Sequence, residues 1–148
     1  MTKRIDIAQT QPAALTAMMS VENYLAETKL SSALKELIKI RASMINQCAY
    51  CIQMHTQEAL KAGIPPQKLF AVSAWKESPL FDAAERAVLA LTDELTHVSQ
   101  AGLTDSTYQA CLELLGEDQI AQVIMQVIMI NAWNRFSIAT KMTHQRAG

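Results

Sequence analysis

The sequence has few glycines and few aromatic residues, and both scarcities argue against a β-rich fold. Of its 148 residues only 4 are glycine and 5% are aromatic. No Asn-Gly or Asp-Gly pair separates two alternating apolar runs, as a tight β-hairpin would favour. Half of the residues are hydrophobic, with many Ala, Leu, Ile and Met, which favours helices. We therefore predict an all-α fold in a single domain over residues 1–148, long enough to form a core without disulfide or metal support.

The chain also lacks a strong net charge, a long apolar run and a signal-like N-terminus. Its formal net charge is −1, so neither nucleic acid nor an anionic membrane surface is expected as a partner. The longest apolar stretch, Val123 to Ile130, is interrupted by Gln126 and is too short to span a bilayer. Met1 to Asp6 carry charges with no apolar run behind them, unlike a secretory signal. These features predict a cytoplasmic protein, where a Cys-x-x-Cys pair is more typical of a redox or metal site than of a structural bridge.

Helical spacing and capping residues divide the chain into a series of expected helices. Asp82 and Glu85 have the spacing of a capping box, and Gly116 should end a helix. The last helix is apolar on nearly every face from Ile120 to Ile130, so it should be buried centrally or against another subunit. The expected helices are about Pro12–Ala26, Ser31 or Ser32 to Ile45, Cys48–Ala62, Gln67–Trp75, Ala83–His97, Asp105–Leu115 and Glu117–Met142.

Two cysteines and a histidine share one face of a predicted helix. Cys48 and Cys51 are one helical turn apart, and His55 lies one turn further along. If the helix begins at Cys48, both sulfurs lie in its first turn, where unpaired N–H groups and the helix dipole favour a thiolate. His55 could take or return a proton at neutral pH. Glu36, on the preceding helix and off its apolar seam, could reach the same place, so the sequence predicts a redox centre.

The same residues allow two other interpretations. Cys48, Cys51, His55 and Glu36 could be ligands of a structural zinc ion, although such sites usually take a second pair of ligands from a separate Cys/His cluster that this sequence lacks. Alternatively, the cysteines could be small hydrophobic residues of the core, and Glu36 an exposed helix carboxylate.

Other polar residues have structural explanations that we favour. Arg41 falls on the apolar seam of its helix, and a buried arginine needs a charged partner. We therefore predict a structural ion pair for Arg41. Glu58 has the spacing of a surface pair with Lys61. Trp133 is expected to pack in the core or at an interface. Cys111 stands alone in an Ala/Leu-rich stretch, and we expect it to be inert.

A set of residues in the middle of the chain carries a family resemblance. The chain resembles the alkylhydroperoxidase AhpD-like proteins of the carboxymuconolactone decarboxylase superfamily, over roughly Leu30 to Lys141. The resemblance implies an all-α fold that assembles as a homo-trimer or hexamer. The residues that carry it are Glu36, the run Lys39–Asn46, Cys48–Cys51, Met54, His55, Ala59, Ala62 and Gly63, with Ile130–Ala139 as a weaker match.

The same resemblance implies a thiol peroxidase. In it Cys51 attacks the peroxide, Cys48 resolves the product as a disulfide, and Glu36 and His55 relay the proton. It also implies an organic hydroperoxide as substrate, a dithiol reductant protein or a lipoyl partner as electron donor, and no cofactor. The chain departs from the family at Tyr50, where the characterised alkylhydroperoxidase has a further catalytic His. Because the tyrosine pKa is near ~10, Tyr50 is a poor base, and weaker peroxidase activity or a different substrate is expected.

Two functions from other classes stay open at this point. One is decarboxylation of a carboxylated lactone, which the superfamily includes, but the redox pair would be idle in that chemistry. The other is a non-catalytic redox sensor or interaction module, in which formation of the disulfide changes assembly.

Overall fold

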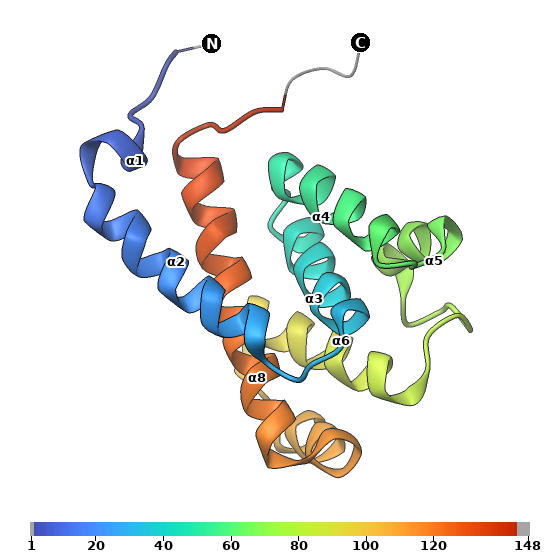
Figure 1. Ribbon diagram of the computed structural model, residues 1–148. Helices are drawn as coiled ribbons and strands as arrows, with labels where there is room; N and C mark the ends of the chain where they lie inside the picture. Colours follow the sequence, from blue (N-terminus) through green and yellow to red (C-terminus); the bar gives the residue numbers. More distant parts are fainter. Residues whose placement is uncertain (1, 145–148) are drawn as a thin grey trace.

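The computed structural model describes residues 2–144, and within that range the chain forms helices and no strand. The prediction of an all-α fold is confirmed (Figure 1). Two parts of the chain lie outside the described residues. They are Met1, which begins the segment expected not to be a secretory signal, and residues 145–148, which belong to the expected domain. No helix in the described range is long and apolar enough to cross a membrane. The elements are α1 (Ile7–Thr10), α2 (Pro12–Glu27), α3 (Ser32–Ile45), α4 (Ala49–Lys61), α5 (Pro66–Ala71), η1 (Val72–Ala74), α6 (Ala83–Thr96), α7 (Val98–Ala101) and α8 (Asp105–Ala139).

Local sequence explains where the main helices begin and break. The Ser31 hydroxyl accepts a hydrogen bond from the Leu34 N–H at 3.2 Å and caps α3. Asp82 and Glu85 form the predicted capping box of α6, each side chain accepting from the other residue's N–H at 2.9 Å. Gly116 interrupts α8 with φ 80° and ψ 167°, so the two helices expected here form one element with a kink. Glycine suits this position because it has no Cβ to clash at positive φ.

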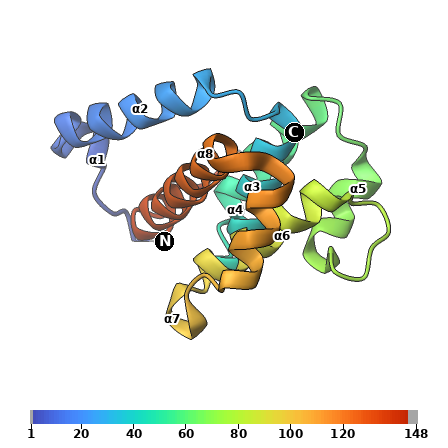
Figure 2. The ribbon, with the colours of Figure 1, turned by 90° about the horizontal axis from the view of Figure 1, so that it is seen from below.

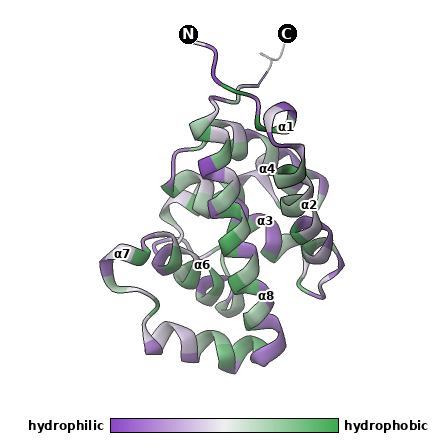
Figure 3. Ribbon diagram, turned by 90° about the vertical axis from the view of Figure 1, so that its left-hand side faces the viewer, coloured by the Kyte–Doolittle hydropathy of each residue, from purple (hydrophilic) through white to green (hydrophobic). Residues whose placement is uncertain are grey.

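The core lies where α3, α6 and the second half of α8 pack against one another. Strongly hydrophobic residues follow one another along α8 (Figure 3). Between residues 120 and 130 the buried ones are Ile120, Val123, Val127, Met129 and Ile130. The prediction of a buried C-terminal helix is therefore confirmed for the face that meets α3 and α6, whereas Ile124 and Met125 are half-buried and Ile128 is 50% exposed. The buried residues shared by these helices include Ile38, Ala42, Val88, Leu91, Val123, Val127 and Ile130.

An ion pair joins α3 to α6 at the edge of this core. Arg41 Nε lies 2.6 Å from Asp93 Oδ1, and Arg41 Nη2 donates to Asp93 Oδ2 at 3.2 Å. The Trp75 indole N–H also donates to Asp93 Oδ2, at 3.1 Å. Arg41 therefore has the structural partner that its position on the apolar seam predicts.

The helix α2 lies along α8 on the side of the molecule away from α5 (Figure 2). The Trp133 indole N–H on α8 donates to Glu22 Oε1 on α2 at 2.7 Å, and the Trp133 ring packs edge-on against Phe136. The segment before α1 reaches the C-terminal end of α8, where Arg4 Nη1 donates to the Ala139 carbonyl at 2.8 Å. The segment before α1 thus lies against the C-terminal end of α8 (Figure 1).

Candidate active site

The turn between α3 and α4 sets the position of Cys48. Gln47 has a positive φ of 55°, which reverses the chain, and the Cys48 N–H then donates to the Ser43 carbonyl at 2.9 Å. The Asn46 side chain donates to Asn134 Oδ1 on α8 at 3.0 Å, and Asn134 donates to the Ser43 hydroxyl at 3.0 Å. Because this turn is hydrogen-bonded to α8, α4 begins at a fixed place against the core.

The two cysteines of the motif are bonded to each other at the start of α4. Their Cα atoms are 5.3 Å apart, within the range that disulfides span. Cys48 is the N-cap rather than the first residue of the helix, and its sulfur accepts from the Cys51 N–H at 3.3 Å. Both residues are 1% exposed. The sulfurs therefore lie next to the unpaired N–H groups of the helix, where a thiolate is favoured over a thiol.

Glu36 from α3 and His55 from α4 meet beside this pair. Glu36 Oε2 lies 3.5 Å from His55 Nδ1, at the outer limit of a hydrogen bond, and both residues are 8% exposed. The interpretation of Glu36 as an exposed carboxylate is therefore wrong, because α4 covers this face of α3. A carboxylate on the Nδ1 side favours the tautomer in which that nitrogen carries the proton, leaving Nε2 free to accept one.

Lys39 is the third member of this charged group, and the motif analysis did not assign it a part. Lys39 Nζ lies 2.8 Å from Glu36 Oε1. Burial raises the pKa of the Glu36 carboxyl, but the neighbouring His55 imidazole and Lys39 ammonium outweigh burial and lower that pKa below its ordinary value. Glu36 is therefore an anion at neutral pH. The three-residue spacing of Glu36 and Lys39 was the sequence signal available for this pair.

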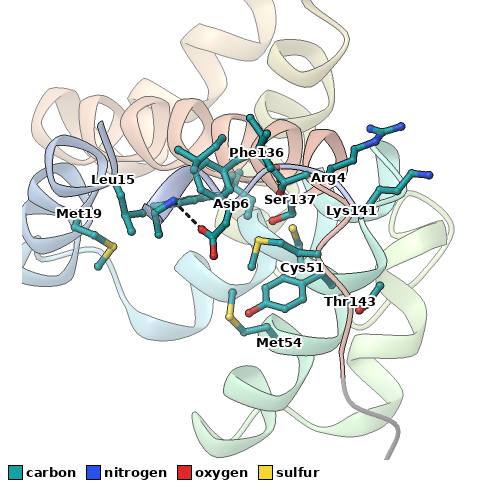
Figure 4. A pocket seen from close by; sticks show the side chains of 18 of the residues that line it. Arg4, Asp6, Leu15, Met19, Cys51, Met54, Phe136, Ser137, Lys141 and Thr143 are labelled. Atoms are coloured by element: carbon teal, nitrogen blue, oxygen red, sulfur yellow. Dashed lines mark hydrogen bonds between the residues drawn. The ribbon is translucent and has the colours of Figure 1, made fainter. Parts of the chain in front are cut away.

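A pocket of about 860 Å³ lies between the N-terminal segment, α2, α4 and the C-terminal half of α8. Cys51 and His55 border it, whereas Cys48 is not among its lining residues. Figure 4 shows Cys51 and Met54 on the α4 side of the pocket and Phe136 on the α8 side. The sequence analysis did not identify the pocket, because segments from both ends of the chain build it. Its large apolar lining residues are Ile5, Ile7, Leu15, Met19, Met54, Ile130, Trp133, Phe136 and Met142.

Tyr50, the residue that departs from the family pattern, also borders the pocket. Its ring stacks on the imidazole of His144, with centroids 4.4 Å apart and planes at 8°. His144 Nε2 lies 2.6 Å from the Tyr50 carbonyl oxygen. An imidazole from the C-terminal segment thus lies beside the position where the characterised alkylhydroperoxidase has a histidine, and no helical spacing in the sequence links these two residues.

The remaining candidates lie away from the pocket. Cys111 is buried in the core, where burial and the charge of Glu94 raise the pKa of its thiol to about 11. Glu58 and Lys61 form the predicted exposed pair, with Oε1 and Nζ 3.0 Å apart. In the part of the chain that the structure describes, no group of three or more His, Cys, Asp or Glu side chains is arranged to hold a metal ion.

Comparisons with known proteins agree with the motif and the fold. The sequence pattern of the carboxymuconolactone decarboxylase family matches residues 12–94, which include the Cys-x-x-Cys helix. The uncharacterised protein YdfG of Bacillus subtilis (strain 168) is 34% identical over 139 residues, covering 94% of this chain and 95% of the relative.

Solved structures show the same fold. A protein of unknown function from Agrobacterium tumefaciens, provisionally assigned to antioxidant defence as AhpD, is 32% identical, has a TM-score of 0.95 and covers 99% of this chain and 100% of its own. The debrominase Bmp8, solved with 2,3,4-tribromopyrrole, has a TM-score of 0.82 at 19% identity, over 93% of this chain and 73% of its own. At that identity the debrominase shows a shared fold alone.

Proposed function

Because this chain belongs to the carboxymuconolactone decarboxylase family and has an AhpD-like fold, we propose that it is a thiol-dependent peroxidase that reduces organic hydroperoxides. One observation carries the proposal: Cys51, bonded to Cys48, lies with His55 on the wall of an apolar pocket of about 860 Å³. A pocket of this size and lining suits a substrate with an organic group rather than hydrogen peroxide alone.

The first step takes place at Cys51. In the reduced protein His55 Nε2 accepts the Cys51 proton, helped by the Glu36 anion on its Nδ1 side. The thiolate attacks the terminal oxygen of ROOH, so that an S–O bond forms and the O–O bond breaks. His55 returns the proton to the departing alkoxide, giving ROH and a Cys51 sulfenic acid. Assignment of this role to Cys51 is supported by its place on the pocket wall, which Cys48 does not share.

The second step closes the disulfide. The Cys48 sulfur attacks the Cys51 sulfenic acid, an S–S bond forms and water leaves. A dithiol partner, either a reductant protein or a reduced lipoyl group, then exchanges with the disulfide and leaves as its own disulfide, returning both cysteines to thiols. A reducing compartment such as the cytoplasm would keep such a partner reduced. We include assembly as a homo-trimer or hexamer in this proposal.

The experiment that tests the function is a single-turnover reaction. Reduced protein mixed with one equivalent of cumene hydroperoxide should consume the peroxide in a burst, and mass mapping should find the Cys48–Cys51 disulfide. A Cys111→Ser variant, whose altered residue lies in the core, is the matched control and should behave like the wild type. Turnover of a carboxylated lactone by Cys51→Ser would instead indicate a decarboxylase. Slow oxidation that changes the oligomeric state would indicate a redox sensor.

A further inference from the structure

The pocket beside Cys51 differs chemically from one end to the other. Figure 4 shows Leu15 and Met19 at one end, and Arg4 and Lys141 together at the opposite end. The charged end is built from the two ends of the chain, since Arg4 lies on the segment before α1 and Lys141 follows α8. The hydrogen bond from Arg4 Nη1 to the Ala139 carbonyl, at 2.8 Å, fixes the two segments to each other.

The cations at this end have no acidic partner among residues 2–144. The ion pairs of the described chain involve neither Arg4 nor Lys141. Arg4 uses one N–H of its guanidinium on a backbone carbonyl, which leaves its other donors available. Lys3 and Lys39 also line the pocket, and Lys39 is paired with Glu36.

The carboxylates that border the pocket are held by other donors. The Asp6 carboxylate accepts the backbone N–H of Ala8 at 2.9 Å, as the N-cap of α1. Glu22 accepts the Trp133 indole N–H at 2.7 Å. Both acids keep their charge, but neither forms an ion pair with Lys3, Arg4 or Lys141. Three such cations against two carboxylates leave the pocket lining with an excess of positive charge that could bind an anion.

We propose that the physiological hydroperoxide is amphipathic, with an apolar body and a carboxylate, and that the carboxylate binds between Arg4 and Lys141. The apolar body then lies against the Leu15 and Met19 side of the pocket and holds the peroxide group near Cys51. The peroxide part rests on the proposed function, whereas binding of the carboxylate does not depend on it. Arg4 and Lys141 lie outside residues 12–94, so the family match does not assign them any part.

Binding of unreactive probes tests the carboxylate site without any turnover. Cumyl alcohol and its para-carboxylate have the same apolar body and differ in the anionic group. Titration calorimetry should show tighter binding of the carboxylate by about two- to fivefold for each cation it contacts, as expected for exposed charge pairs. The difference should shrink as salt is added, because exposed charges are screened.

Charge-removing variants then locate the site. Lys141→Gln should reduce the preference, and Lys141→Arg should retain it. Lys141 has no side-chain hydrogen bond within residues 2–144, so this change tests charge without breaking a structural contact. Arg4→Gln should also reduce the preference, while Lys61→Gln, on an exposed pair of α4 outside the pocket, should leave it unchanged. Equal affinity of the two probes for the wild type, or a preference that survives both Arg4→Gln and Lys141→Gln, would overturn the proposal.

A kinetic arm links the site to the proposed reaction. Para-carboxycumene hydroperoxide should have a lower KM than cumene hydroperoxide, with similar kcat, and Lys141→Gln should remove that difference. Tighter binding of the carboxylate probe, without turnover of either hydroperoxide, would support the proposed carboxylate site and contradict the proposed peroxidase function. Turnover of both hydroperoxides at equal KM, with equal binding of the two probes, would support the proposed peroxidase function and contradict the proposed carboxylate site.

Discussion

Glu36 faces the imidazole of His55 across the packed helices α3 and α4, with Oε2 3.5 Å from Nδ1 and both residues withdrawn from solvent. This arrangement gives the histidine one nitrogen oriented by an anion and one nitrogen available for proton transfer. The thiol pair lies at the start of the same helix that carries His55. The reactivity of Cys51 should therefore depend on both Glu36 and His55.

Removal of either relay group should slow the reaction with peroxide. Glu36→Gln and His55→Gln should each lower the rate by about 10²-fold, the usual contribution of a general acid–base group. The pH–rate profile should also move alkaline, toward the ~8.5 of a free thiol. Stopped-flow measurement of peroxide loss across pH checks both effects. Glu58→Gln, an exposed carboxylate of α4, is the matched control; a Glu36→Gln profile identical to that of the control would contradict the relay.

Lys39 should control the charge of Glu36. In the folded protein the pKa of Glu36 is below its ordinary value of 4.5, so its ionised form contributes stability above that value, and the contribution is lost as pH falls through the lowered pKa. Lys39→Met removes the cation at 2.8 Å, so that burial, which raises the pKa, is opposed by His55 alone. The variant should therefore begin to lose stability at a higher pH than the wild type.

Thermal unfolding measured from neutral to acid pH checks the effect of Lys39. Lys61→Met removes a similar cation from an exposed pair and should leave the profile of the wild type unchanged. Superimposable profiles for Lys39→Met and Lys61→Met would show that Lys39 does not hold Glu36 in its ionised form.

Oxidation should be confined to the motif cysteines. Cys111 is fully buried, its thiol pKa is raised to about 11, and its sulfur donates to the Ala87 carbonyl at 3.2 Å. Because the thiolate is the reactive form, Cys111 should remain a thiol while Cys48 and Cys51 are converted. Thiol counting and peptide mapping before and after mild peroxide measure this. Oxidation of Cys111 ahead of the pair would contradict the assignment.

Assembly should depend on the exposed part of α8. Ile128 is 50% exposed and borders a shallow hollow with Leu95, Val98 and Ala132. An apolar surface of this kind is typical of a subunit contact, so the wild type should be a trimer or larger, and Ile128→Lys should shift it toward monomer. Light scattering at micromolar concentration reports the mass. Leu60→Lys, at an exposed apolar residue of α4, is the control, and a wild-type monomer would contradict the prediction.

Sequence reasoning predicted those features that short-range rules control. The capping box at Asp82 and Glu85 and the break at Gly116 each follow from the preferences of neighbouring residues, and the structure has both. The one-turn spacing of Cys48 and Cys51 likewise placed the two sulfurs together at a helix start, although Cys48 proved to be the N-cap.

What the sequence did not predict depends on contacts between distant segments. The pocket needs the segment around Arg4 to return to the end of α8, and no periodicity signals that contact. The stacking of His144 on Tyr50 is also long-range. The short helices α1 and α7 were missed because a single turn leaves little hydrophobic pattern. Burial of Glu36 depends on tertiary structure, because only the packing of α4 against α3 shields its side chain from solvent.

The most direct test of the account is identification of the sulfur that takes up oxygen. Cys48→Ser should consume one equivalent of hydroperoxide and accumulate a sulfenic acid on Cys51 that a dimedone-type reagent labels, because no second thiol resolves it. Cys51→Ser should consume none and remain unlabelled. Peptide mass mapping of the label in the two variants gives the answer. A labelled Cys48 in Cys51→Ser, with no label on Cys51 in Cys48→Ser, would contradict the account and reverse the roles of the two cysteines.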